Sequence, residues 1–120
     1  MMEPTIQGTE FGRITVDEVV YERDVLIRPS GRVKKRRKKL SRKDGSSHVI
    51  SLEEAKHIFG KGAERLIIGT GQEGHVRLSE EAQAYFQDQD CSVELLPTPQ
   101  AVEAWNRSEG KAIGMFHVKC

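Results

Sequence analysis

The segment Glu64–Asp90, ERLIIGTGQEGHVRLSEEAQAYFQDQD, contains the pattern that decides the fold. The continuous apolar run Leu66-Ile67-Ile68 predicts a central strand that is buried on both faces of a sheet. A glycine-rich turn, residues 69–74, follows this strand, and a helix is predicted to begin at Ser79–Glu80. A buried strand that ends in glycines before a marked helix start is typical of open α/β sheets, whose ligands bind where strands end.

The alternation of helix and strand continues on both sides of this segment. The predicted elements are a helix from Leu52 to Gly60 or Gly62, the strand 66–68, a helix at 80–88, a strand at 93–96, a helix from Pro99 to Gly110 and a strand at 112–118. Ser51 and Glu54 form a capping box, and Thr98 is predicted to be the N-cap before Pro99. This order predicts an α/β sheet with packed helices and right-handed crossovers.

The N-terminal third has a different pattern. Residues 11–36 contain short apolar runs separated by turn residues, with Asp17-Glu18 as a tight turn, which predicts antiparallel hairpins or a meander. These strands must either extend the sheet or form a second layer. Residues 1–8 are expected to be flexible, and the whole chain, 1–120, is predicted to be a single domain.

The composition excludes several classes of protein. There is no run of about 18 apolar residues and no basic or apolar leader, so neither a membrane span nor a secretory signal is predicted. The chain has two cysteines, too few for a disulfide framework, which favours a reducing compartment. We therefore expect a cytoplasmic protein that does not bind membranes.

A basic run interrupts an otherwise acidic chain. Residues 32–43 hold nine of the 19 basic side chains, and the rest of the chain has ten basic against 18 acidic ones. Because alternate side chains of a strand point to opposite faces, six consecutive cations predict an exposed ribbon or loop rather than a half-buried strand. The run is interpreted either as a charged edge that resists aggregation or as a polyanion site. The candidate polyanion-binding residues are Lys34, Lys35, Arg36, Arg37, Lys38 and Lys39. No aromatic side chain is interleaved for stacking on bases.

A ligand crevice is predicted where two strands end. Gly69, Thr70 and Gly71 follow one strand and Thr98 follows the next, so parallel strands would bring both loops to one edge of the sheet. The N-terminus of the helix from Pro99 would aim N–H groups at a small anion there. Further candidate donors are Ser46, Ser47 and His48. A dinucleotide site is disfavoured because residues 75–78 separate the glycines from the helix.

No catalytic residues, metal ligands or cofactor are predicted. His48 has no carboxylate partner nearby in sequence, and Ser47 lacks the turn motif of a serine nucleophile. His117 and Cys120 would lie on opposite faces of a strand, and no second ligand pair supports them.

Several segments resemble one known family. They are Lys39-Leu40-Ser41, Gly45-Ser46-Ser47-His48-Val49, Ile67-Ile68-Gly69-Thr70-Gly71, Leu95-Leu96-Pro97-Thr98, Ala101-Val102, Trp105-Asn106 and Gly114–Cys120. In this order they are similar to the Mth-domain family, the domain of unknown function 498. Its relatives include the adipogenesis-associated Mth-domain protein and the mitochondrial complex I assembly factor three. The resemblance covers about residues 9–120 and implies a mixed central sheet flanked by helices, plus a small additional β layer from the N-terminal third. It implies no catalytic activity.

Three function classes follow. The favoured one is a non-enzymatic binding or assembly module with an unidentified protein partner, although the sequence does not settle whether the chain is an enzyme. The second is a binder of a small anion or nucleotide derivative at residues 69–71 and 97–98. The third is a weak, non-specific nucleic-acid binder that uses residues 32–43.

Overall fold

The computed structural model describes residues 4–42, 48–108 and 111–119. The strands are β1 (Ile6–Glu10), β2 (Arg13–Val16), β3 (Val19–Tyr21), β4 (Val25–Ile27), β5 (Val33–Lys35), β6 (Val49–Ile50), β7 (Arg65–Thr70), β8 (Arg77–Leu78), β9 (Ser92–Leu96) and β10 (Ala112–His117). The helices are α1 (Lys39–Arg42), α2 (Leu52–Ile58), α3 (Glu80–Asp88) and α4 (Thr98–Arg107).

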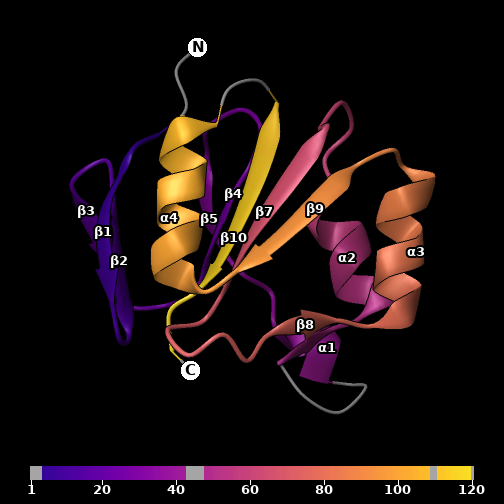
Figure 1. Ribbon diagram of the computed structural model, residues 1–120, viewed down its shortest axis with the longest axis horizontal. Helices are drawn as coiled ribbons and strands as arrows, with labels where there is room; N and C mark the ends of the chain where they lie inside the picture. Colours follow the sequence, from indigo (N-terminus) through magenta and orange to yellow (C-terminus); the bar gives the residue numbers. More distant parts are fainter. Residues whose placement is uncertain (1–3, 43–47, 109–110, 120) are drawn as a thin grey trace.

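The core of the molecule is a mixed five-stranded sheet with the order β5-β4-β10-β7-β9 (Figure 1). Strands β10, β7 and β9 are parallel to one another, whereas β4 pairs antiparallel with β10 and with β5. Ile67 on β7 is 0% exposed and β7 lies between two partners, so the predicted interior strand is confirmed. The mixed α/β fold predicted from the alternation of elements is also confirmed.

Alternation along the strands sends side chains into two separate cores. Leu66 and Ile68 pack on the face that α2 and α3 cover, and Ile67 packs on the opposite face with α4. On that opposite face the ring of Trp105 stands perpendicular to the ring of Phe116, with 6.0 Å between their centroids. Such edge-to-face packing adds to the stabilisation from area burial.

The additional β layer is an antiparallel sheet with the order β1-β2-β3, and it lies beside α4 in Figure 1. Val16 pairs with Val19 across the predicted tight turn, in which Asp17 has φ 46° and Glu18 has φ 68°. Positive φ at both central residues is the geometry of a type I′ hairpin, whose twist matches that of the strands.

Three details differ from the predictions. Part of the segment expected to be flexible, residues 1–8, belongs to β1, because Ile6 is buried against α4. Thr98 is the first residue of α4, and Pro97 takes the N-cap position without a side-chain hydrogen bond. The chain after Gly74 adds β8, which pairs parallel with β6 in a two-stranded ribbon. No helix within the described ranges is long and apolar enough to cross a bilayer.

The basic run does not form one continuous exposed segment. Lys34 and Lys35 belong to the edge strand β5, whereas α1 begins at Lys39. Arg36, between them, is only 2% exposed, so the prediction of full exposure is wrong at this residue. Two buried carboxylates, Asp24 before β4 and Glu54 on α2, pair with Arg36 and offset the cost of burying its charge.

Candidate functional site

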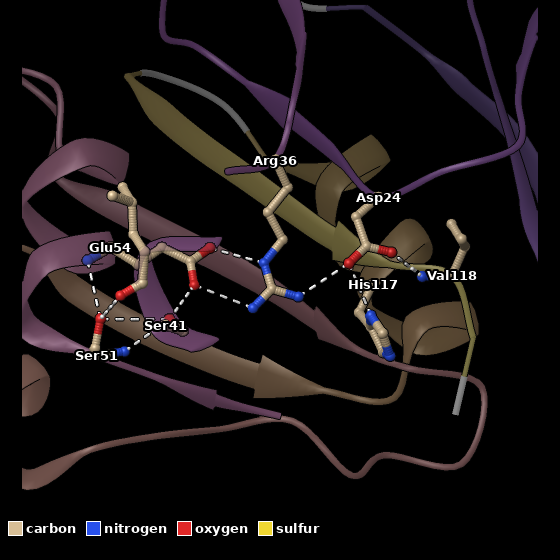
Figure 2. Close-up of polar contacts among 8 residues, drawn as sticks. Asp24, Arg36, Ser41, Ser51, Glu54, His117 and Val118 are labelled. Atoms are coloured by element: carbon tan, nitrogen blue, oxygen red, sulfur yellow. Dashed lines mark hydrogen bonds and ion pairs between the residues drawn. The ribbon is translucent and has the colours of Figure 1, made fainter. Parts of the chain in front are cut away.

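A chain of buried polar side chains crosses the α2 side of the central sheet, from Glu54 through Arg36 and Asp24 to His117 (Figure 2). Asp24 directly precedes β4, Arg36 directly follows β5, and His117 ends β10. Asp24 and His117 have the same strand parity as Leu26 and Met115, which face α2 and α3. Glu54 reaches them from the first turn of α2.

Arg36 is held by two carboxylates. Its Nε donates to Glu54 Oε2 at 2.7 Å and its Nη2 donates to Glu54 Oε1 at 3.1 Å, a bidentate pair. Its Nη1 donates to Asp24 Oδ2 at 2.9 Å. Burial alone would lower the pKa of Arg36, but the hydrogen bonds and charges of Glu54 and Asp24 raise it. The guanidinium therefore stays charged in the core.

Glu54 also contacts two serines, Ser41 through its carboxylate and Ser51 through its backbone N–H. Ser41 of α1 donates its hydroxyl to Glu54 Oε1, and the Ser51 N–H donates to Ser41 Oγ at 3.0 Å. Ser51 also accepts from the Glu54 N–H at 3.2 Å, which confirms the N-cap half of the predicted capping box. The Glu54 carboxylate is instead committed to Arg36 and Ser41, so α1, α2 and β5 are joined through one side chain.

Asp24 joins Arg36 to the end of β10. Its Oδ2 lies 2.8 Å from His117 Nδ1, and its Oδ1 accepts from the Val118 N–H at 2.9 Å. Burial would raise the pKa of Asp24, but the hydrogen bond and charge of His117, the Val118 amide and the Arg36 charge lower it to about 2. Asp24 is therefore ionised at neutral pH and can only accept, so His117 Nδ1–H donates the hydrogen bond to the carboxylate.

Acid should destabilise the protein through Asp24. Its folded-state pKa is depressed, so its stabilisation is present above the ordinary value of 3.8 and is lost as pH falls toward about 2. We expect the free energy of unfolding to drop by about 2 kcal/mol from this group between roughly pH 5 and pH 2. Urea unfolding across this pH range measures the drop.

Asp24→Asn is the control for the acid effect. This variant should be less stable at pH 7 and should lose much of the pH dependence below pH 4, because the titrating carboxyl is gone. An unchanged slope in the variant would assign the acid effect to other carboxylates.

The Nε2 atom of His117 is the one buried side-chain nitrogen or oxygen without a hydrogen-bond partner among the residues that the structure describes. His117 is 4% exposed, and its ring stands nearly perpendicular to that of His48 at 5.6 Å between centroids. His48 in turn lies 6.4 Å from the exposed ring of His75. Burial, together with repulsion from His117 and His75, lowers the pKa of His48. Buried polar atoms without a hydrogen-bond partner are uncommon in folded proteins, and a functional role is one explanation for such an atom.

The two loops of the predicted crevice do lie together. The Gly71 N–H donates to Thr98 Oγ1 at 2.8 Å, and the Thr98 N–H donates to the Gly71 carbonyl at 2.9 Å. However, Thr98 is fully buried, and its hydroxyl also donates to the His117 carbonyl at 2.6 Å. A Cβ on Gly69 would lie 2.9 Å from Thr98 Oγ1, so the threonine fills the space between the loops. Ligand binding by Gly69, Thr70 and Gly71 stays a prediction.

Other predicted site residues have different surroundings. Thr70 is buried and pairs in register with His117, and its carbonyl accepts from the Val76 N–H at 2.9 Å. His48 precedes β6, and its carbonyl accepts from the Arg77 N–H at 2.9 Å. Ser46 and Ser47 lie outside the described residues. No group of three or more metal-ligating side chains within the described ranges could hold a metal ion.

Sequence reasoning missed the buried network itself. The glutamate of the capping box, Glu54, was recognised only as part of a helix start. Asp24, an acid immediately before the fully buried strand Val25–Ile27, was the one local signal for a buried charge pair. Nothing local linked either residue to Arg36, which is one of six consecutive cations.

Comparisons with known proteins agree on one family. The model of a family described as "Protein of unknown function (DUF498/DUF598)" matches residues 6–116. The conserved hypothetical protein PH1505 from Pyrococcus horikoshii OT3 has a similar structure, with a TM-score of 0.87 and 28% identity over 97% of this chain and 99% of that one. A structure named MT938 is similar over 98% of this chain and 100% of its own, with a TM-score of 0.82 and 28% identity. A Mth938-like domain from Bordetella pertussis shares the fold at 17% identity and a TM-score of 0.65, over 96% of this chain and 85% of that one.

Proposed function

The chain belongs to the DUF498/DUF598 family, which has no assigned activity, and within this family we propose a non-enzymatic assembly module that binds an extended segment of a partner protein along β3. The family membership confirms the resemblance to the Mth-domain family. The observation that carries the proposal is an open strand edge with apolar side chains. Among the described residues β3 pairs only with β2, and Val19 and Val20 on it are 51% and 55% exposed.

The opposite edge of this small sheet is capped at Ile6, the first residue of β1. Asn106 of α4 accepts from the Ile6 N–H at 2.9 Å and donates to the Ile6 carbonyl at 2.8 Å. One side-chain amide thus pairs with β1 as a neighbouring strand would. Unpaired strand edges are usually short, charged or covered. β3 is short, with three residues, but it is uncovered and carries two exposed valines, which suits it to pairing with another chain.

Hairpin geometry places the main chain of Val20 at the open edge. In a two-residue hairpin the closing pair, here Val16 and Val19, is the hydrogen-bonded one. The next pair, Thr15 and Val20, is not hydrogen-bonded, so the N–H and C=O of Val20 point away from β2. An added strand would bond to these two groups.

The surroundings of β3 define the chemistry of the partner. Asp17, Glu18 and Glu22 flank the strand and are exposed, and they outnumber the neighbouring exposed cation Arg23, which lies 5.4 Å from the centroid of the Tyr21 ring. The exposed Phe11, in the turn between β1 and β2, belongs to the same sheet. The complementary segment is therefore extended, alternates apolar residues, and carries basic residues at its ends.

Three of the side chains that could act in catalysis are either paired with buried partners or have a raised pKa, which favours a binding function over a catalytic one. The carboxylates of Asp24 and Glu54 are committed to buried partners. Burial also raises the pKa of the Cys91 thiol, which opposes a nucleophilic role at neutral pH. The cytoplasmic location expected from the cysteine content is part of this proposal.

A displayed library of random peptides of about ten residues, selected on the immobilised protein, tests the proposal, since peptides of this length can cover the three residues of β3 and both of its flanks. Selected peptides should alternate apolar residues and carry Lys or Arg. Val20→Pro removes the outward N–H without removing a bond to β2, and it should weaken peptide binding at least about tenfold. The matched control Val20→Thr keeps both the N–H and the β-branched shape, and it should bind as the parent protein does.

Two results would contradict this function. Equal binding by the proline and threonine variants would mean that the peptides bind elsewhere. A parent protein that is dimeric in size-exclusion chromatography with light scattering, and that becomes monomeric with Val20→Pro, would make a second copy of this chain the occupant instead.

A further inference from the structure

We propose that residues 35–42 form a preorganised site for a compact, multiply phosphorylated ligand, separate from the protein-docking edge at β3. The segment surrounds a concavity of about 310 Å³. Its lining residues are Lys35, Arg36, Arg37, Lys38, Lys39, Leu40 and Arg42. We call this concavity the cationic basin.

The buried network holds the basin at two points. Near its start, Arg36 is anchored in the core by Glu54 and Asp24, and its own N–H donates to the Asp24 carbonyl at 3.3 Å. Near its end, the side chain of Ser41 turns inward to Glu54 and accepts from the Ser51 N–H. Glu54 therefore contacts both Arg36 and Ser41. Because contacts with the core fix these two residues, the conformation of the backbone between them is determined by the fold.

This double anchoring sends the remaining cations outward. Arg36 and Ser41 are buried, whereas Lys35, Arg37, Lys39 and Arg42 are exposed and Lys38 is half-buried. Like charges repel, so clustering them costs free energy that the core network offsets during folding. A ligand that binds these cations does not have to order the segment itself, and such preorganisation increases affinity.

The lining selects phosphate groups. Among the residues that the structure describes, every charged side chain of the lining is cationic, and none is an aromatic on which a base could stack. Lysine and arginine bind phosphate through charge-assisted hydrogen bonds. The chain outside residues 32–43 has ten basic and 18 acidic side chains, so the net charge of the rest of the molecule disfavours anions, whereas the basin concentrates positive charge.

The size of the basin favours a compact ligand. Ligand pockets of small molecules start at about 300 Å³, and the basin lies at that lower limit. Within the described ranges a single segment, residues 35–42, lines it, so a long nucleic acid could place only a few phosphates within reach of these cations. Several phosphates concentrated in one small molecule make better use of the same cations.

Calorimetric titration of the full chain with inorganic tripolyphosphate tests this proposal. The parent protein should bind at roughly 50 mM salt, and its affinity should fall at least about tenfold at roughly 200 mM because the contacts are ionic. A basin variant should lose at least about thirtyfold in affinity at the lower salt concentration. That variant carries Arg37→Gln, Lys38→Gln, Lys39→Gln and Arg42→Gln.

A charge-matched control separates the site from the overall field. It removes the same number of cations from exposed positions elsewhere, through Lys61→Gln, Arg77→Gln, Arg107→Gln and Lys111→Gln. The control should keep tripolyphosphate affinity within about threefold of the parent, because screened charges outside the basin contribute little. Circular dichroism and a melting curve check that both variants are folded.

The outcomes separate the two sources of clustered phosphate. Tighter binding of tripolyphosphate than of a mixed-sequence single-stranded RNA 20-mer, at equal phosphate concentration, supports the compact site. Tighter binding of the RNA would overturn it in favour of a nucleic-acid surface. Equal losses in the basin and control variants, or no binding by the parent protein, would also overturn it. The β3 variants do not alter the basin, so failure here leaves the docking proposal separately testable.

Discussion

Glu54→Leu should lower the free energy of unfolding by about 3 to 5 kcal/mol, because it leaves the buried guanidinium of Arg36 with one of its two carboxylate partners, Asp24. The same change removes the carboxylate that accepts from the Ser41 hydroxyl, whose remaining acceptor among the described residues is Ser51 Oγ, at the longer distance of 3.4 Å. Urea unfolding followed by the fluorescence of Trp105, the single tryptophan, measures this loss. The control Glu53→Leu changes the exposed neighbour on α2 and should alter the stability by less than about 1 kcal/mol.

A second variant shows that the loss comes from an unpaired charge. In Glu54→Leu combined with Arg36→Met, both members of the pair are apolar, and much of the stability should return. The coupling between the two sites should reach about 2 kcal/mol or more. Additive effects of the two substitutions would mean that Glu54 stabilises α2 by itself and that the ion pair contributes nothing.

Ile67→Asp should prevent folding. Ile67 lies on β7 between β10 and β9, and it packs among apolar side chains of α4 and the small sheet. A carboxylate there would be buried without a partner, which costs more than the about 5–15 kcal/mol of stability typical of a domain. Circular dichroism and a thermal melt of the purified variant provide the measurement.

Leu95→Asp is the matched control for that change. Leu95 lies on β9, at the edge of the same sheet, and is exposed. The new carboxylate remains hydrated, so the variant should melt cooperatively within a few degrees of the parent. Cooperative melting of Ile67→Asp itself would contradict the burial of β7.

Local signals were sufficient for most of the elements. The apolar run Leu66-Ile67-Ile68 predicted an interior strand, and Ser79 predicted the start of α3. Each depends on interactions that span a few residues, namely strand alternation, a continuous apolar run and a side-chain cap. The turn at Asp17-Glu18 was predicted for the same reason, since the hairpin needs only a short connection.

Local sequence patterns gave a wrong prediction where a side chain could form either a local or a long-range hydrogen bond. Thr98 was a plausible N-cap, but its hydroxyl bonds instead to Gly71, which follows β7, and to His117, which ends β10. The adjacency of the two loops was predicted correctly from parallel strands. Only the packed structure placed a buried threonine between them, because side-chain volume is decided by all neighbours together.

The amino-acid sequence by itself determined the α/β class, the order of most elements and the family, because periodicity, caps and motifs are properties of neighbouring residues. Tertiary structure alone decided that Arg36 would leave its run of cations and enter the core. Its partners Asp24 and Glu54 are 12 and 18 residues away, and His117 is 93 residues from Asp24. A charge can be buried only where opposite charges and hydrogen bonds converge on it, and that convergence exists only once β4, β5, α2 and β10 have come together.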